Sequence, residues 1–404
     1  MSSVPLLSSA TLSAQCSRSN GSAGHVPLEL RHSPLLSRAF RSFVLFLPLC
    51  LARGCRPEGP EAPTSALRLS VSPAMASATV ARPGDERNSL AIYGYPVAQS
   101  VSPKIFNHLF PLLGLPRHTY GAVECRSLDE PGNAWEEAIK RADCLGTCLT
   151  MPLKLQALRK VDELTPEARA TGCVNTTFFR PSPTSSSTLV HVGTNTDAAA
   201  VSNVLLSSFL GVSSPLLASA PRQFQPGNAG AFVVGGGGAT RAAIYALSRL
   251  NLSPIFIVNR DPSETERVVQ SFPDIDLRPL TTIEQARREM EDLRKRGVRL
   301  VCGVSAIPCE PPTSEGEKRV YEVANEVFAL AGGKGPEMER MERHEGCLPL
   351  PMKPAFVDMV YKPPMTTLRI LAEERGWTTV CGTEVVLENC FGSFPCSVSF
   401  LERH

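Results

Sequence analysis

Short apolar runs alternate with amphipathic stretches from about residue 90 to the end of the chain. Apolar runs predict buried strands, whereas apolar positions three and four residues apart predict helices. The pattern predicts strands at residues 90–93, 120–123, 144–150, 174–179, 189–193, 231–234, 254–258, 300–304, 355–360 and 378–381. It predicts helices at residues 102–113, 135–141, 153–161, 165–171, 197–210, 239–250, 263–271, 283–296, 320–331, 365–375 and 384–394. This alternation predicts an α/β protein with mainly parallel sheets.

One strand is followed by a glycine-rich turn, in the sequence AFVVGGGGATRAA from residue 231. The residues Gly235, Gly236, Gly237, Gly238 and Ala239 lie between a buried strand and an amphipathic helix. Such a turn lets a dinucleotide pyrophosphate approach the backbone at a helix N-terminus. A flexible linker is the alternative, but the flanking strand and helix favour a dinucleotide-binding unit.

Length and loop-like tracts divide the pattern into domains. A chain of 404 residues is long enough for two. Polar residues 181–188 predict a surface loop, and the Ser/Pro/Gln-rich residues 211–230 predict an inserted loop. We expect a first α/β domain at residues 87–197, completed by a C-terminal helix at 383–404. A Rossmann domain is expected at residues 198–382.

Composition argues against several classes of protein. The net charge of +2 speaks against a broad nucleic-acid interface. The 13 cysteines include no CxxC pair and no Cys/His cluster at zinc spacing, so no metal is expected. Cys144 and Cys148 are interpreted as packing residues. Scattered cysteines fit a reducing compartment. The expected oligomeric state is a monomer or homodimer.

Residues 1–86 differ in being rich in Ser, Pro and Arg and poor in acids. They are interpreted as a disordered extension, with a transit peptide as the alternative. A third possibility is that they are not translated, since Met75 stands shortly before the first strand. The apolar run 43–52 is too short to span a bilayer. We favour a cytoplasmic protein without a membrane partner, with organelle import through residues 1–74 left open.

Further motifs occur in a fixed order along the chain: YGYPVAQSVSP from residue 93, LTMPLK from 149, GCVNT from 172, GTNTD from 193, VNR from 258, DMVYKPPMT from 358 and GTEVVLEN from 382. With the glycine turn, they resemble the shikimate/quinate dehydrogenase family, and in particular a stand-alone, fungal-like member. The resemblance covers most of residues 90–404. It implies reversible hydride transfer between NADP or NAD and a ring carbon of a small hydroxylated cyclohexane or cyclohexene carboxylate.

The resemblance also implies roles for individual residues. It implies that residues 87–197 with 383–404 bind the substrate and that the active site lies in the cleft between the two domains. There, Lys154 and Asp197 would form the catalytic pair. The implied substrate ligands are Ser100, Ser102, Thr150, Asn175, Tyr361 and Asn389. The implied cofactor ligands are the four glycines, Ala239, Asn259, Arg260, Met359 and Gly382.

The catalytic pair makes chemical sense. Alcohol oxidation needs a base for the hydroxyl proton, and ketone reduction needs an acid. A lysine can serve if partial burial lowers its pKa, and an aspartate can orient it. Each residue also has an ordinary interpretation. Lys154 suits a solvated surface charge, Asp197 and Ser102 suit helix N-caps, and Asn175 suits a turn.

Some positions depart from the family pattern. Cys148 and Asn389 replace an asparagine and a glutamine, and Glu384 and Val385 replace a glycine and a methionine of bacterial members. These changes leave the substrate open between shikimate and quinate. For the cofactor, the pair Asn259-Arg260 favours NADP, because arginine accommodates a 2′-phosphate. Asp261 would repel that phosphate if it faced it, so NAD stays possible.

Two other functions fit parts of the pattern. One is a non-catalytic regulator that senses quinate or shikimate on the same fold. The other is a Rossmann oxidoreductase that acts on a different polyol acid. The presence of both Lys154 and Asp197 favours the enzyme, because a sensor has no need of a proton-transfer pair.

Overall fold

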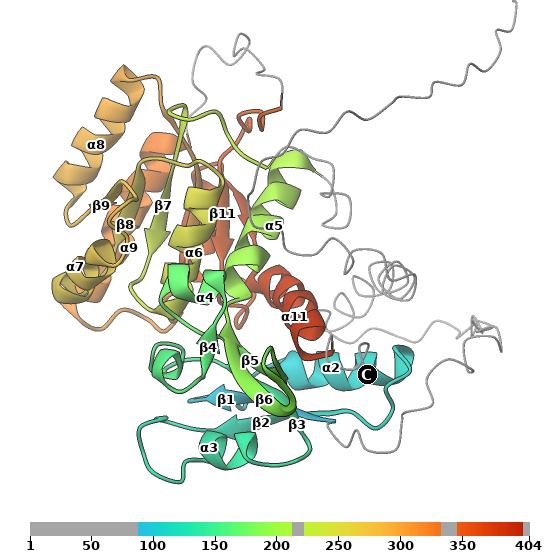
Figure 1. The fold of residues 1–404 in the computed structure, drawn as a ribbon. Coiled ribbons are helices and arrows are strands. Elements are labelled where there is room, and N and C mark those ends of the chain that lie inside the picture. The colour runs from blue at the N-terminus through green and yellow to red at the C-terminus, as the bar shows by residue number, and fades with distance from the viewer. Residues whose placement is uncertain (1–87, 212–221, 333–345, 399–404) are drawn as a thin grey trace, which may run out of the picture. The chain divides into compact units, whose positions relative to one another are not determined.

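The computed structural model describes residues 88–211, 222–332 and 346–398, whose fold is drawn in Figure 1. By its contacts the chain divides into two units, 1–73 and 74–404, and all described residues lie in the second. The interpretations of residues 1–86 therefore fall outside the described residues. The described residues form two six-stranded sheets with helices packed on them, so the predicted α/β fold class is confirmed.

The first sheet has the strand order β2-β1-β3-β5-β6-β4. Its strands are β1 (Ser89–Gly94), β2 (Thr119–Glu124), β3 (Cys144–Leu149), β4 (Glu163–Leu164), β5 (Thr176–Ser182) and β6 (Ser185–Thr194). Its helices are α2 (Ser102–Leu112), α3 (Ala134–Ile139), the 3₁₀ helix η4 (Gln156–Arg159) and α4 (Pro166–Thr171). Strands β1, β2 and β3 are parallel, whereas β5 runs antiparallel to both β3 and β6.

The register of this sheet brings distant motifs to one edge. Cys148 of β3 pairs with Thr176 of β5, which pairs with Thr194 of β6. Because β5 is antiparallel to its neighbours, its start lies beside the ends of β3 and β6. The segments that follow Cys148, precede Thr176 and follow Thr194 therefore meet. These segments are the motifs LTMPLK, GCVNT and GTNTD.

The second sheet has the order β12-β11-β10-β7-β8-β9, and all its strands are parallel. Its strands are β7 (Ala229–Val234), β8 (Ile255–Val258), β9 (Leu277–Pro279), β10 (Arg299–Ser305), β11 (Ala355–Asp358) and β12 (Thr378–Val380). This is the Rossmann order, with the switch point between β7 and β10. Ligands of such sheets bind at the carboxyl ends of the strands beside that point, and here the glycine turn follows β7.

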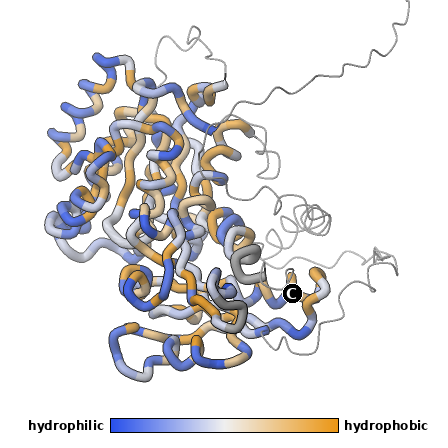
Figure 2. The backbone as a smooth tube through the Cα atoms, viewed as in Figure 1, coloured by the Kyte–Doolittle hydropathy of each residue, from blue (hydrophilic) through white to orange (hydrophobic). Residues whose placement is uncertain are grey.

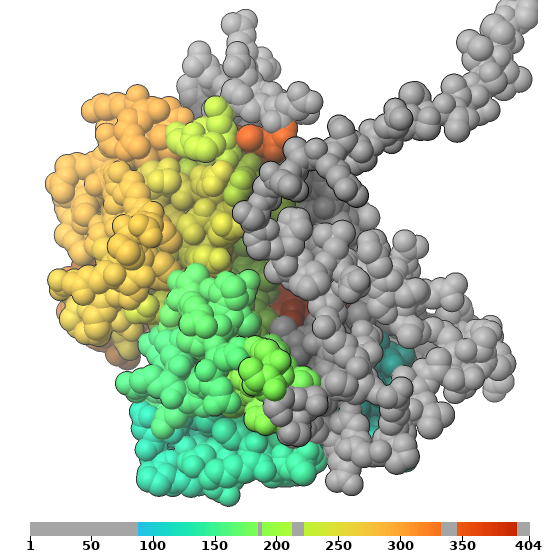
Figure 3. All heavy atoms as spheres, viewed as in Figure 1, coloured from blue at the N-terminus to red at the C-terminus, as the bar shows by residue number. Residues whose placement is uncertain are grey.

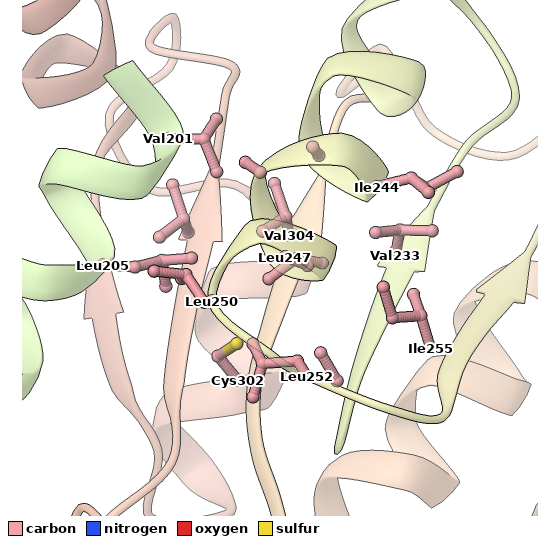
Figure 4. Packing of buried hydrophobic residues seen from close by; sticks show 14 of the residues in the cluster. Val201, Leu205, Val233, Ile244, Leu247, Leu250, Leu252, Ile255, Cys302 and Val304 are labelled. Carbon is pink, nitrogen blue, oxygen red and sulfur yellow. The ribbon is translucent and has the colours of Figure 1, made fainter. Parts of the chain in front are cut away.

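Helices cover both faces of the second sheet. They are α5 (Asp197–Leu210), α6 (Gly238–Arg249), α7 (Pro262–Gln270), α8 (Ile283–Lys295), α9 (Glu315–Ala331) and α10 (Thr367–Glu374). Figure 4 shows α5 and α6 placing Val201, Leu205 and Leu247 over the strands. A second buried cluster, with Phe232 and Phe328, joins the opposite face to α8, α9 and α10. A fully buried side chain of this kind contributes about 1.5–3 kcal/mol.

The last helix, α11 (Gly382–Val398), packs on α5 and also on β5, β3 and α2. Helix α4 packs on α6, as the contact between green and yellow atoms in Figure 3 shows. In Figure 2 the hydrophobic residues follow the strands of the second sheet, and the hydrophilic residues follow the outer face of helix α8. Among the described residues no helix is both long and apolar enough to cross a bilayer.

Several predicted elements were wrong in detail. The predicted helix at 153–161 is a turn followed by the four-residue η4. The predicted loop at 181–188 is largely a hairpin, because β5 and β6 continue into it and pair. Ser102 is the first residue of α2, and its side chain does not cap the helix. Helix α9 begins at Glu315, five residues before the predicted start at Val320, because a capping box of Ser314 and Glu317 starts it. The short strands β4 and β9 were missed.

Candidate active site

Lys154 and Asp197 meet at the edge of the first sheet where the ends of β3 and β6 lie beside the start of β5. The Lys154 Nζ donates a hydrogen bond to Asp197 Oδ2 over 2.7 Å. The side chains are 16% and 4% exposed, so this is a largely desolvated ion pair. Lys154 lies in the turn after β3, and Asp197 is the first residue of α5. The structure thus brings together the two residues that the sequence assigned to catalysis.

Two opposing effects set the pKa of Lys154. Burial alone lowers the pKa, as expected, but the Asp197 carboxylate attracts the ammonium and accepts its hydrogen bond. The net result is a pKa above the ordinary value of 10.5. The condition for a lysine that acts as a base, a pKa lowered by partial burial, is therefore not met in this pair. Lys154 is a protonated acid at neutral pH, which suits proton donation to a carbonyl oxygen.

The other oxygen of Asp197 is bound by the C-terminal helix. The Asn389 side-chain amide donates a hydrogen bond to Asp197 Oδ1. Asn389 Oδ1 in turn accepts from the hydroxyls of Thr196, over 2.6 Å, and Ser393, over 3.1 Å. Helix α11 therefore fixes the orientation of the carboxylate that holds Lys154. Asn389 was predicted to contact substrate. In this structure, its amide nitrogen and its amide oxygen both form hydrogen bonds with other side chains of the protein.

Asn175 is buried and bonded to the turn that leads into α5. Its Oδ1 accepts the Thr196 backbone N–H over 2.9 Å, and its Nδ2 donates to the Thr196 hydroxyl over 3.0 Å. Thr196 and Ser393 were missed by sequence reasoning. Both had a signal, since Thr196 precedes Asp197 in GTNTD and Ser393 lies four residues after Asn389, on the same helix face.

The predicted ligands Ser100, Ser102 and Tyr361 form a second group. Burial raises the pKa of Tyr361, and the nearby Ser100 side chain and Val101 backbone partly oppose that rise. Burial also raises the pKa of Cys390, next to Asn389, and the nearby Ser102 side chain opposes that rise. Lys362, next to Tyr361, donates to the Gln99 carbonyl over 2.9 Å.

Thr150 and Cys148 lie at the end of β3. The Thr150 backbone N–H donates to the Tyr93 carbonyl over 2.8 Å, and the residue is half-buried. Cys148 contacts the Thr176 hydroxyl over 3.9 Å, and burial raises the pKa of its thiol. A neutral thiol thus stands where the family resemblance implies an amide.

The four glycines have distinct surroundings. Gly235 has a φ of +120°, which favours glycine. A Cβ atom at Gly236 would lie 2.5 Å from Asn259 Nδ2, whereas one at Gly237 would meet nothing within 4 Å. Gly237 precedes α6, which lacks a side-chain cap. An open glycine beside uncapped helix N–H groups fits a pyrophosphate.

The glycine turn adjoins the Lys154–Asp197 pair. A Cβ atom at Gly238 would lie 3.1 Å from the Lys154 Cβ. The Cys173 thiol lies 3.2 Å from the Gly238 carbonyl oxygen, to which it donates. The start of α6 therefore lies beside the Lys154 segment.

The other predicted cofactor residues flank this turn. Asn259 Nδ2 donates to Glu264 Oε2 over 2.9 Å, and Arg260 is paired with Glu317 of α9. A Cβ atom at Gly382 would lie 2.5 Å from the Met359 carbonyl oxygen, so these two segments are in contact. Ala239 lies in the first turn of α6. Within the described residues, no group of three or more His, Cys, Asp or Glu side chains is placed to hold a metal ion.

Comparison with known protein families gives a match over part of the first sheet. A family model described as the shikimate dehydrogenase substrate binding domain matches residues 92–177. The matched region runs from β1 into β5 and contains Ser100, Ser102, Thr150, Lys154 and Asn175.

Solved structures share the fold. The dehydroquinate dehydratase and shikimate dehydrogenase of S. pombe has a TM-score of 0.55 and 28% identity, over 78% of this chain and 50% of that one. This chain therefore spans half the length of that protein. The Thermus thermophilus shikimate 5-dehydrogenase, solved with NADP(H) and shikimate, has a TM-score of 0.51 and 24% identity, over 77% and 94%. The Listeria monocytogenes enzyme, solved with shikimate and NAD, has a TM-score of 0.54 and 20% identity, over 80% and 95%.

Proposed function

We propose that the chain, whose residues 92–177 match the shikimate dehydrogenase substrate binding domain, is an NAD(P)-dependent oxidoreductase acting on a ring hydroxyl of shikimate or quinate, or on the ketone of their 3-dehydro forms. The observation that carries the proposal is the position of the Lys154–Asp197 pair, bonded over 2.7 Å. The Lys154 Cβ lies 3.1 Å from a Cβ built on Gly238, at the start of the helix that follows the glycine turn. A proton donor and a dinucleotide-binding turn are thus adjacent.

The chain's own residues move and hold the proton. When bound, the nicotinamide cofactor supplies or accepts the hydride. In ketone reduction, the Lys154 ammonium donates a proton to the carbonyl oxygen. In alcohol oxidation, Lys154 must first lose its proton, which its raised pKa disfavours at neutral pH. Asp197, held by Asn389, keeps the ammonium in one orientation. Positioned acid–base assistance of this kind contributes about 10²–10⁴-fold in rate.

Neutral polar groups are proposed as the substrate ligands. Ser100, Ser102, Thr150 and Tyr361 offer hydroxyls that suit a carboxylate and several ring hydroxyls. An amide nitrogen carries two hydrogens, so Asn175 and Asn389 each retain one N–H beyond the bonds described. A site built from such groups discriminates against analogues that leave its polar atoms unpaired.

The proposal extends to domain organisation and compartment. We assign residues 87–197 and the helix at 383–404 to substrate binding, and residues 198–382 to cofactor binding. The packing of α11 on β5 and α2 supports this division. A cytoplasmic location and a monomeric or homodimeric state rest on composition alone.

Transfer of an isotope label tests the reaction class. Purified protein is incubated with 3-dehydroshikimate or 3-dehydroquinate and a reduced cofactor deuterated at the transferred position. We expect mass spectrometry to find deuterium on the ring carbon of the product. A protein that binds these acids in calorimetry but transfers no deuterium with either cofactor would instead be the sensor on the same fold.

A further inference from the structure

A carboxylate lies at the end of the second Rossmann strand, although the sequence places it inside a helix. Glu264 belongs to the first turn of α7, and its side chain accepts a hydrogen bond from Asn259, the residue after β8, over 2.9 Å. A Cβ atom built on Gly236 would lie 2.5 Å from the same Glu264 oxygen. The carboxylate is therefore held against the glycine turn, at the carboxyl end of β8.

The arginine that the sequence proposed for this place is engaged elsewhere. Arg260 forms an ion pair with Glu317 of α9. The Glu317 carboxylate also accepts the backbone N–H groups of Thr313 and Ser314 over 2.9 and 3.0 Å, and these bonds help to lower its pKa to about 2. Glu317 thus stays ionised, and Arg260 is attracted toward α9. Because the Arg260 side chain is 63% exposed, its ion pair with Glu317 is weak. The pair favours the orientation of Arg260 toward α9 without fixing it.

Two other charged groups near this turn have partners of their own. Asp261 caps α7, accepting the Ser263 and Glu264 N–H groups over 2.8 and 3.3 Å. Arg267 donates to the Ser263 hydroxyl on its own helix. Arg241, in the first turn of α6, has a buried Nε without a hydrogen-bond partner, and its guanidinium lies 3.4 Å from a Cβ built on Gly172, beside the end of α4. Glu264 is therefore the carboxylate that the contacts of the described residues place against Gly236 and Asn259.

The geometry points to Glu264 as the residue that selects NAD over NADP. This inference rests on the proposed function, in which a nicotinamide dinucleotide binds at the glycine turn. In dinucleotide folds, an acid at the end of the second strand accepts hydrogen bonds from the adenosine ribose. A 2′-phosphate at the same place would bring like charges together, which costs affinity. The inference reverses the preference for NADP drawn from Arg260.

Cofactor binding without substrate tests the inference. Titration calorimetry measures the dissociation constants of NAD and NADP for the wild type, Glu264→Gln and Glu264→Arg. We expect the wild type to bind NAD at least about tenfold more tightly than NADP, as the loss of a charge-assisted hydrogen bond implies. Glu264→Gln keeps an oxygen that can accept the hydrogen bond from Asn259 but removes the charge, so the ratio of the two dissociation constants should move toward one. Glu264→Arg inverts it.

Glu266→Gln is the matched control, because it removes the same charge from an exposed position on the same helix. We expect it to leave both constants unchanged. The inference is overturned if the wild type binds NADP as tightly as NAD, or if Glu264→Gln leaves the ratio of the two constants intact. A selective loss of NADP affinity in Arg260→Ala would identify the arginine as the determinant instead. Failure of both cofactors to bind would refute the proposed function as well.

Discussion

Removing Lys154 is expected to impair turnover and stability by separable amounts. The side chains of the pair are 16% and 4% exposed, so Lys154→Ala leaves the Asp197 carboxylate buried without its cation. Breaking a buried pair in this way typically costs about 3–5 kcal/mol of unfolding free energy. Asn389 still donates to Asp197 in the variant, so we expect a value near the lower end. Loss of the acid should lower kcat by about 10²–10⁴-fold.

Asp197→Asn changes the charge and keeps the shape. Without the carboxylate, the burial that lowers the pKa of Lys154 is no longer opposed. Lys154 then loses its proton at a lower pH, so the alkaline limb of the ketone-reduction profile moves toward neutral pH. The contribution of the pair to stability should be complete at neutral pH. It should disappear only as the pH rises through the raised pKa of Lys154, above 10.5.

The assay is a double-mutant cycle over Lys154→Ala and Asp197→Asn. Initial rates across pH give kcat and KM, and urea denaturation gives the unfolding free energies. Because the two residues act as a unit, the double variant should be scarcely slower than the worse single variant. KM should change far less than kcat. Additive losses in kcat, or near-normal turnover in Lys154→Ala, would refute this reasoning.

Three further outcomes are expected. Gly237→Val should fold normally, because a Cβ there meets no protein atom within 4 Å, yet it should weaken dinucleotide binding in calorimetry; unchanged affinity would exclude the glycine turn as the pyrophosphate site. Burial raises the pKa of Asp358 from 3.8 to about 6, so the folded state binds more protons than the unfolded state between these values, and stability should fall by about 3 kcal/mol as pH rises through that window. Asp358→Asn should flatten this dependence in urea melts, and a variant that retains the wild-type slope would assign it to other groups. Asn389→Ala should lower kcat about tenfold or more with little change in KM, since it removes a hydrogen bond to the charged Asp197; an effect on KM alone would make Asn389 a substrate ligand only.

The second sheet was readable because its four central strands, β11, β10, β7 and β8, are buried along nearly their whole length. Strands β7 and β8 are buried along their whole length, so their runs stand out in the sequence. The hairpin of β5 and β6 was not readable, since its tip is polar and low in complexity and is held by cross-strand pairing. The short strands β4 and β9 lack a period long enough to detect.

The pairing of Lys154 with Asp197 was predictable because both lie in contiguous motifs. The sign of the Lys154 pKa shift was not, because two opposing effects of burial and attraction must be compared in space. The same limit applies to Glu264. A carboxylate that folds back from a helix to the end of β8 is invisible to a rule that inspects only the residue after the strand.

The most direct test of the proposed function is a set of initial rates with purified protein. Shikimate and quinate are each supplied with NAD and with NADP, and reduction of the nicotinamide is followed by its absorbance. We predict turnover with at least one of the two acids, faster with NAD than with NADP, and reduced by at least about a hundredfold in Lys154→Ala. An absence of turnover in all four combinations, by a protein that binds both a ring acid and a dinucleotide, would contradict the assignment.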